Sequence, residues 1–169
     1  MPELLEPIFG ALNSAGVRYV VVGGLATVLH GYARLTADVD VVVDLEPEEA
    51  RKAIAALAGL GFRPRAPVNA TDFADPDMRA SWIRDKGMRV FSMQDPKQPM
   101  REVDLFVEHL VPFEGLWTRS EVITLATTTV RVASIPDLIA LKRVANRSQD
   151  LEDIAALEAI LRRREADRG

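Results

Sequence analysis

The sequence has no cysteine and only two histidines, His30 and His109, among its 169 residues. The lack of cysteine excludes disulfides and thiolate metal sites, and two imidazoles are too few for a zinc site without carboxylate help. No apolar run is long enough to span a membrane, and the acidic start Met-Pro-Glu-Leu-Leu-Glu does not resemble a signal peptide. We therefore expect a cytoplasmic protein that makes no membrane contact.

Hydrophobic residues make up 48% of the chain and charged residues 27%, which is typical of a folded domain with a real core. The length fits one domain, with an expected core over residues 1–133 and a helical section over 134–169 packed on it. A net charge of −4 argues against a strongly basic nucleic-acid binder. Residues 63–101 nevertheless hold eight basic and five acidic side chains. This basic stretch is either a solvated loop region or a surface that faces phosphate groups.

Apolar periodicity and turn residues predict an alternation of helices and short strands. Helices are expected over 3–15, 25–30, 50–60, from about 135 to a break at 148–150, and over 151–164 with Asp150 as its cap. Strands are expected over 18–22, 38–43, 81–84, 89–92, 102–107, 122–125 and 129–132, with loops over 63–80 (apart from one short helix near Phe73) and 94–100. This alternation predicts an α+β (mixed α/β) fold, in which a small mixed sheet is flanked by helices.

Two acids begin a strand that is otherwise made of valine. Asp38 and Asp40 project from the same face, because side chains alternate along a strand. Two neighbouring carboxylates repel each other and are costly to bury, so we expect a cation between them. Upstream, Gly23 and Gly24 end the first strand and open a short helix. Glycines there allow a bound group to approach the backbone closely, and the amides at a helix start favour anions.

A third acid, Asp104, lies among apolar residues on a later strand. If that strand pairs beside the strand of Asp38 and Asp40, the three carboxylates meet at one edge. Oxygen donors without thiolates suit Mg²⁺ or Mn²⁺ rather than zinc. Two such ions could activate an attacking hydroxyl and steady a leaving pyrophosphate, while the glycine turn holds triphosphate oxygens.

Gly-Gly, a short helix, Asp-x-Asp and a third Asp on a later strand together resemble the nucleotidyltransferase superfamily that includes DNA polymerase beta. Two longer segments are similar to the AbiEii/AbiGii type, which includes toxins of type IV toxin–antitoxin systems. They are Val-Gly-Gly-Leu-Ala…His-Gly-Tyr-Ala-Arg-Leu-Thr-Ala-Asp-Val-Asp over 22–40 and Pro-Asp-Leu-Ile-Ala-Leu-Lys…Asn-Arg-Ser-Gln-Asp-Leu-Glu-Asp-Ile over 136–154. The resemblance spans most of the chain and is weakest over 63–100.

The resemblance implies a nucleotidyltransferase fold whose helical C-terminal section covers the active cleft. It implies transfer of a nucleoside monophosphate from an NTP to a hydroxyl of RNA, such as a tRNA 3′ end, or of a protein, and an antitoxin protein as the partner of toxin members. The implied metal ligands are Asp38, Asp40 and Asp104, the last also helping to deprotonate the acceptor. The residues implied in nucleotide binding are Gly23, Gly24, Arg34, Thr36 and Lys142.

The chain departs from this pattern at one position. Many active members carry a serine after the glycines, where this chain has Leu25, and Thr27 is the nearest hydroxyl. A nucleotide-binding module with weak catalysis, acting as half of a protein pair, therefore stays an alternative. So does a small-molecule adenylyltransferase of the antibiotic-resistance kind, which shares the three acids and needs an acidic pocket for a cationic drug.

Overall fold

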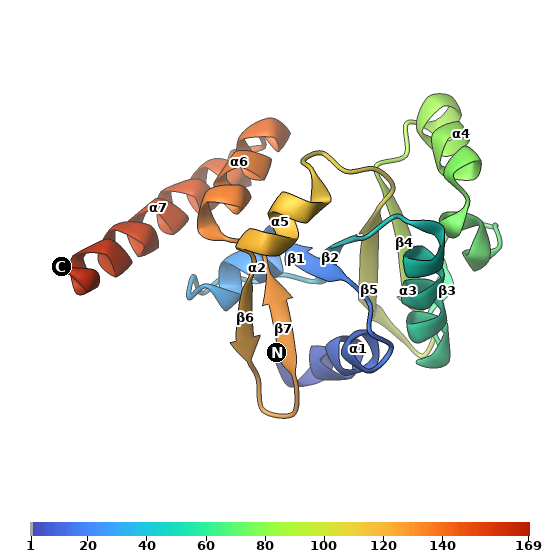
Figure 1. The fold of residues 1–169 in the computed structure, drawn as a ribbon, viewed down its shortest axis with the longest axis horizontal. Helices are drawn as coiled ribbons and strands as arrows, with labels where there is room; N and C mark the ends of the chain where they lie inside the picture. Colours follow the sequence, from blue (N-terminus) through green and yellow to red (C-terminus); the bar gives the residue numbers. More distant parts are fainter. Residues whose placement is uncertain (1) are drawn as a thin grey trace.

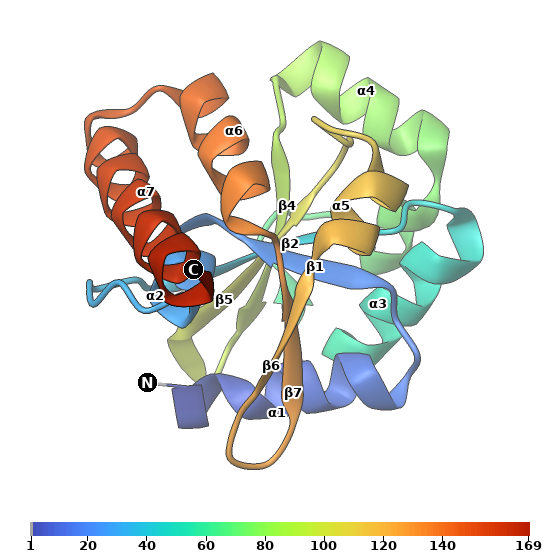
Figure 2. The same ribbon diagram turned by 60° about the vertical axis from the view of Figure 1, so that its left-hand side comes forward.

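The computed structural model describes residues 2–169, with side chains from Leu4 onward, and consists of one mixed sheet with helices on both faces (Figures 1 and 2). The helices are α1 (Pro2–Ser14), α2 (Gly23–Leu29), α3 (Pro47–Gly59), the 3-10 helix η1 (Ala70–Ala74), α4 (Pro76–Lys86), α5 (Phe113–Arg119), α6 (Ile135–Ala145) and α7 (Ser148–Arg168). The strands are β1 (Tyr19–Val22), β2 (Asp38–Val43), β3 (Arg63–Pro64), β4 (Val90–Asp95), β5 (Gln98–Phe106), β6 (Glu121–Thr124) and β7 (Thr129–Val132). The mixed α/β prediction is confirmed.

The seven strands lie in the order β3-β4-β5-β2-β1-β7-β6. The central pair β1–β2 is antiparallel, whereas β2 runs parallel to β5 and β1 runs parallel to β7. In the parallel pair, Asp40 lies opposite Asp104 and Asp38 opposite Glu102. The acids of two strands that are more than sixty residues apart in sequence are thereby brought side by side.

The central strands are rich in valine because both faces of the sheet are covered there. All four residues of β1 are buried, and in β2 burial alternates at the start and becomes continuous at the end. On one face, Phe9 of α1 stacks on Tyr19 with ring centroids 6.4 Å apart. α1 and α3 lie on that face, and α5 and α6 lie on the other (Figure 2). The first two positions of β2 that face the second side are Asp38, which is exposed, and Asp40, which is half-buried.

Residues 81–84 were expected to form a strand of a hairpin, and this prediction is wrong. They belong to α4, where Trp82 is buried in the core. Asp75 caps this helix by accepting from the amide of Asp77, Pro76 occupies its first turn, and Gly87 ends it in a left-handed conformation. A run of four residues is too short for its periodicity to outweigh these capping signals.

Residues 94–100 were expected to form a loop, but β4 and β5 continue through them as a tight hairpin. The register shifts between Gln94 and Asp95, and this irregularity admits the prolines near the turn, where no ladder amide is needed. Helix α5 was not predicted. The last helix begins at Ser148 rather than at 151, so Asp150 lies in its first turn and not at its cap.

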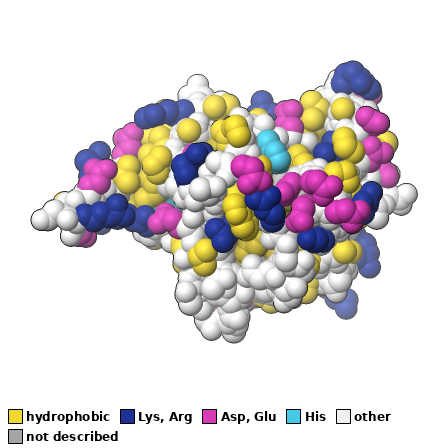
Figure 3. All heavy atoms as spheres, viewed as in Figure 1, with side chains coloured by type: hydrophobic (Ala, Val, Ile, Leu, Met, Phe, Trp, Pro, Cys, Tyr) yellow, Lys and Arg dark blue, Asp and Glu magenta, His cyan; other side chains and the backbone are white. Residues whose placement is uncertain are grey.

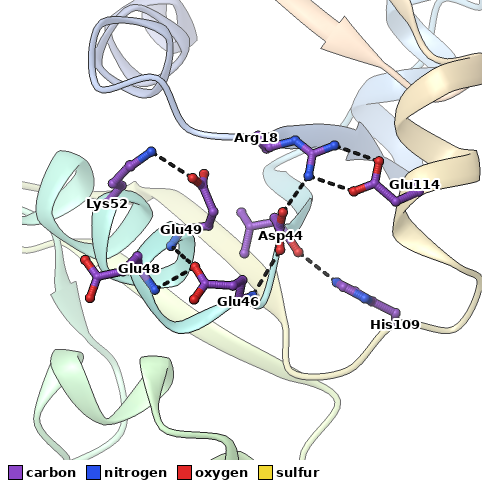
Figure 4. Close-up of polar contacts among 9 residues, drawn as sticks. Arg18, Asp44, Glu46, Glu48, Glu49, Lys52, His109 and Glu114 are labelled. Carbon is purple, nitrogen blue, oxygen red and sulfur yellow. Dashed lines mark hydrogen bonds and ion pairs between the residues drawn. The ribbon is translucent and has the colours of Figure 1, made fainter.

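The end of β2 opposite its acids is fixed by polar contacts (Figure 4). Arg18 donates to Asp44 at 2.7 Å and to Glu114 of α5 at 2.7 and 2.8 Å. The ring of His109 lies 2.8 Å from the carbonyl oxygen of Val43. On the face of the molecule that Figure 3 shows, acidic side chains gather over α3 and α5, with basic side chains among them. No helix within residues 2–169 is both long and apolar enough to cross a membrane.

Candidate active site

The open start of β2 carries the candidate site. Asp38 is exposed and Asp40 is half-buried, and both face the same side as Asp104 of β5. On the next strand, the hydroxyl of Ser92 donates to Oδ1 of Asp104 at 2.6 Å. Three neighbouring strands therefore place Ser92, Asp104 and Asp40 in one row across the sheet. Ser92 was not singled out from the sequence, although it lies at a less buried position of a strand in which buried and half-buried residues alternate.

The two neighbouring carboxylates have strongly perturbed acidities. Burial, together with the charges of Asp104 and Asp38, raises the pKa of Asp40 to about 7, against the opposing charges of Arg147 and Lys142. Burial also raises the pKa of Asp104 to about 6, although the hydrogen bond from Ser92 acts in the opposite direction. Across residues 2–169, no side chain or amide donates a hydrogen bond to the Asp40 carboxylate. A cation beside these oxygens would relieve both the repulsion and the loss of solvation.

The acids fit a hard divalent ion that shares its ligands with a substrate. Within the described part of the chain, no group of three or more His, Cys, Asp or Glu side chains is close enough to hold a metal ion by itself. Mg²⁺ usually binds one or two carboxylates and completes its shell with water and substrate phosphates. Asp40 and Asp104 offer such oxygen-only ligands, and their raised pKa values indicate uncompensated negative charge.

The glycine turn lies directly against the acids and the loop that precedes them. Gly23 has a φ of +71°, and a Cβ atom added to it would collide with the carboxylate of Asp40. A Cβ atom on Gly24 would lie 2.7 Å from Nη2 of Arg34 and 3.0 Å from Oγ1 of Thr36. Only glycine therefore permits the turn, one acid and both loop side chains to converge.

The residues after the glycines offer no hydroxyl to a ligand. Leu25 is buried in the core. Thr27 is completely buried, and its hydroxyl donates to the carbonyl oxygen of Gly23 at 3.2 Å. Thr27 thus does not replace the serine found in many nucleotidyltransferases. A phosphate at this turn would depend on backbone amides and on the nearby cations.

Lys142 is buried in an ion-paired cluster rather than solvated. Its Nζ lies 2.8 Å from Oδ2 of Asp153 and 3.9 Å from Oδ1 of Asp150, both on α7. Nη2 of Arg34 lies 3.0 Å from the same Asp153 oxygen. Asp153 therefore joins the two cations that the sequence assigned to nucleotide binding, and Arg147 pairs with Asp150 at 2.9 Å. The sequence signal for Asp153 was weak: two acids three residues apart on a helix with apolar neighbours.

A mixed sheet with paired acids on adjacent strands, facing a glycine turn, is the arrangement of a nucleotidyltransferase. The chain belongs to the family described as "Nucleotidyltransferase of unknown function (DUF6036)", whose profile matches residues 9–164. No protein of curated function shows significant sequence similarity to this chain.

Several solved structures share the fold. The lincosamide antibiotic adenylyltransferase LnuA, bound to lincomycin, is 15% identical with a TM-score of 0.63, over 95% of this chain and 98% of LnuA. ANT(2″)-Ia in complex with adenylyl-2″-tobramycin is 15% identical with a TM-score of 0.58, over 98% and 95% of the two chains. An antigenic nucleotidyltransferase-like protein from Paracoccidioides brasiliensis is 17% identical with a TM-score of 0.52, over 89% and 72%. At these identities the likeness shows the fold alone.

Proposed function

We propose that this protein transfers a nucleoside monophosphate from an NTP to a hydroxyl group of RNA, such as a tRNA 3′ end, in a reaction that depends on Mg²⁺ or Mn²⁺. The observation that carries the proposal is the pair Asp40 and Asp104, which lie opposite each other on parallel strands beside the Gly23 turn. A pair of half-buried carboxylates with raised pKa values is costly for folding, whereas it suits the binding of a metal-bound triphosphate.

In this proposal the metal ligands are Asp38, Asp40 and Asp104. When bound, the divalent ion stabilises the negative charge that develops on the transferring phosphate. Asp38 is the most exposed of the three and lies at the entry of the site. Asp40 lies deepest, against Gly23, where its carboxylate and the backbone of the turn line the same space.

Asp104 is the proposed general base. Ser92 occupies one of its oxygens, which fixes the orientation of the carboxylate and leaves the other oxygen for the acceptor hydroxyl. Without a bound ion, burial raises the pKa of Asp104 to about 6, so its carboxylate is more basic than that of an ordinary aspartate.

The proposed phosphate contacts come from the turn of Gly23 and Gly24 and from the side chains of Arg34, Thr36 and Lys142. Arg34 and Lys142 share the single carboxylate of Asp153, so this trio keeps a net positive charge. That charge is held in place by burial rather than by flexible surface side chains. It would attract the triphosphate of a nucleotide lying along Asp40 and Asp104, which we call the acid row.

The RNA acceptor is supported by the positive balance of residues 63–101, which include β3 and β4 beside the acid row. A toxin-type role with an antitoxin partner rests on the resemblance of the two motif segments to AbiEii-type proteins. The second candidate, transfer to a small-molecule antibiotic, is favoured by the fold shared with LnuA and ANT(2″)-Ia.

The test is to incubate the protein with labelled NTPs, Mg²⁺ and either total tRNA, lincomycin or tobramycin. Label on tRNA that is lost in Asp40→Ala and retained in the matched surface variant Asp167→Ala is the expected result. Label transfer that persists in Asp40→Ala would refute the metal site. Label on a drug alone would select the second candidate, and no label on any acceptor, with no NTP-dependent rise in melting temperature, would favour a binding module without turnover.

A further inference from the structure

A hollow of about 240 Å³ opens in the surface beside the acid row. Its lining residues follow β3 or lie before and within β4, and these strands are on the side of the sheet away from α6 and α7 (Figure 1). Six residues line it: Arg65, Ala66, Met88, Val90, Phe91 and Ser92. None of the metal and nucleotide ligands proposed above is among them.

The strand register connects this hollow to the proposed base. The amide of Arg65 donates to the carbonyl oxygen of Ser92 at 2.9 Å, so Arg65 extends the pairing of β3 with β4. Ser92 lies opposite Asp104, and Asp104 lies opposite Asp40. Arg65, directly after β3, therefore continues the row of Ser92, Asp104 and Asp40 across the sheet. Ser92 both lines the hollow and donates to Asp104, so a group bound in the hollow is one strand away from the base.

The lining has a definite chemical preference. Met88 and Val90 are half-buried apolar walls, and no acid is among the lining residues. Arg65 is the one charged residue of the six, and its side chain is 67% exposed. Its Nη1 lies 3.4 Å from both carboxylate oxygens of Glu102, whose side chain is 14% exposed, and this long pairing leaves the other guanidinium donors available. The hollow therefore suits a ligand with an apolar or flat body and an anionic group, and it disfavours a polycation.

We propose that this hollow holds the acceptor and selects an anionic one: a nucleotide, free or at the 3′ end of an RNA strand. The nucleobase of this acceptor lies against Met88 and Val90, its phosphate contacts Arg65, and its sugar hydroxyl reaches Asp104. The inference rests on the proposed function and adds the residues that choose the acceptor. Arg65 is a specificity-determining residue in this scheme, because it touches the acceptor and takes no part in the bond change.

The transfer itself balances without a further reactant. The acceptor oxygen forms a bond to the α-phosphorus of the NTP, and the bond from that phosphorus to the oxygen bridging to the β-phosphate breaks. Pyrophosphate leaves with the electron pair of the broken bond. The proton of the hydroxyl passes to Asp104, on the oxygen that does not accept from Ser92.

The experiment measures acceptor binding and transfer separately. Binding of uridine monophosphate, of a single-stranded pentaribonucleotide, of uridine and of tobramycin is followed by calorimetry without NTP. Transfer to each is followed with labelled NTP and Mg²⁺. The variants are Arg65→Glu, which reverses the charge, and Val90→Phe, which fills the hollow. The matched control is Arg162→Glu, an equal change of charge at an exposed position of α7. Thermal unfolding checks that each variant is folded.

We expect Arg65→Glu and Val90→Phe to weaken binding of the nucleotide probes at least tenfold, and Arg162→Glu to change it less than twofold. The uncharged uridine should bind at least tenfold more weakly than the nucleotides and be insensitive to Arg65→Glu. Tighter binding by the pentaribonucleotide than by the mononucleotide would identify an RNA end as the source, and equal binding a free nucleotide.

Nucleotide binding that is unchanged in Arg65→Glu and Val90→Phe, or tobramycin as the best ligand, would overturn the inference even if label is transferred. The same holds if no nucleotide probe binds. Arg65-dependent binding with no transfer to any acceptor would support the hollow as a nucleotide-binding site and refute the proposed reaction. Failure of the inference and failure of the proposed function are therefore distinguishable.

Discussion

Replacing Asp40 by asparagine is expected to make the protein more stable while abolishing nucleotidyl transfer. The folded protein holds the proton of Asp40 to about pH 7, whereas an unfolded chain releases it near the ordinary pKa of 3.8. Ionisation of this group therefore destabilises the fold. The penalty grows from about pH 4 to about pH 7 and is constant above that range. Asparagine has nearly the same shape and never carries the charge.

The size of the gain follows from the same shift. A pKa raised from 3.8 to about 7 corresponds to a ceiling of about 4 kcal/mol in the free energy of unfolding, at about 1.4 kcal/mol per unit. Asp40 stays partly accessible to water, and the native structure relaxes around a charge, so we expect about half of this value. For a chain of this length, about 2 kcal/mol raises the melting temperature by roughly 4–8 °C.

The assay is thermal or urea unfolding of the wild type and Asp40→Asn at pH 8 and pH 5, with a chelator present. The variant should be more stable at pH 8, and the difference should shrink at pH 5, where the wild-type carboxyl is already protonated. Mg²⁺ with NTP should stabilise the wild type and not the variant. The control Asp167→Asn removes an exposed acid and should change stability by less than about 0.5 kcal/mol. A variant that is no more stable than the wild type at pH 8, or is equally stabilised at both pH values, refutes the reasoning.

Three further predictions concern the neighbours of this carboxylate. Gly23→Ala should lose transfer and about 1–3 kcal/mol of stability, measured by activity and urea unfolding, because φ is +71° and the added carbon meets the acid of β2. Lys142→Ala should cost about 1–3 kcal/mol in the free energy of unfolding, because the buried Asp153 loses one of its two cations and keeps Arg34, and adding Asp153→Asn should restore part of it; equal losses in the single and double variants would contradict this. Ser92→Ala removes the hydrogen bond that lowers the pKa of Asp104, so the acid limb of the pH–rate profile should move to higher pH; an unmoved limb would exclude Asp104 as the base.

The acid row and the glycine turn could be predicted from the sequence because both are local. Alternation along a valine-rich strand places Asp38 and Asp40 on one face, and two adjacent glycines mark a turn. The meeting with Asp104 required an assumption about which strands pair, and the parallel register of β2 and β5 confirms it. Local patterns do not specify pairing between distant strands, since that depends on the packing of the whole sheet.

Other parts of the site could not be predicted because their signals are tertiary. Lys142 looks like any lysine of an amphipathic helix until the next helix folds back and places Asp153 beside it. The hollow brings Arg65 and Ala66, from the stretch 63–80 where periodicity was weak, against Met88 and three residues of β4, and this meeting depends on the pairing of β3 with β4. Residues 94–100 were predicted as loop because prolines disfavour strands, and only the hairpin geometry makes them acceptable.

The place of β7 in the sheet has a consequence for synthesis of the protein. The partner on the second side of β1, Thr129–Val132, is made more than a hundred residues after β1 itself. Until then, β1 presents an uncovered edge with the apolar sequence Tyr-Val-Val-Val, which invites pairing with other chains. Truncation before residue 129 should therefore give aggregates rather than a smaller folded core. Lys142 and Asp153 follow later still, so the proposed nucleotide site is completed only after all seven described strands of the sheet have been made.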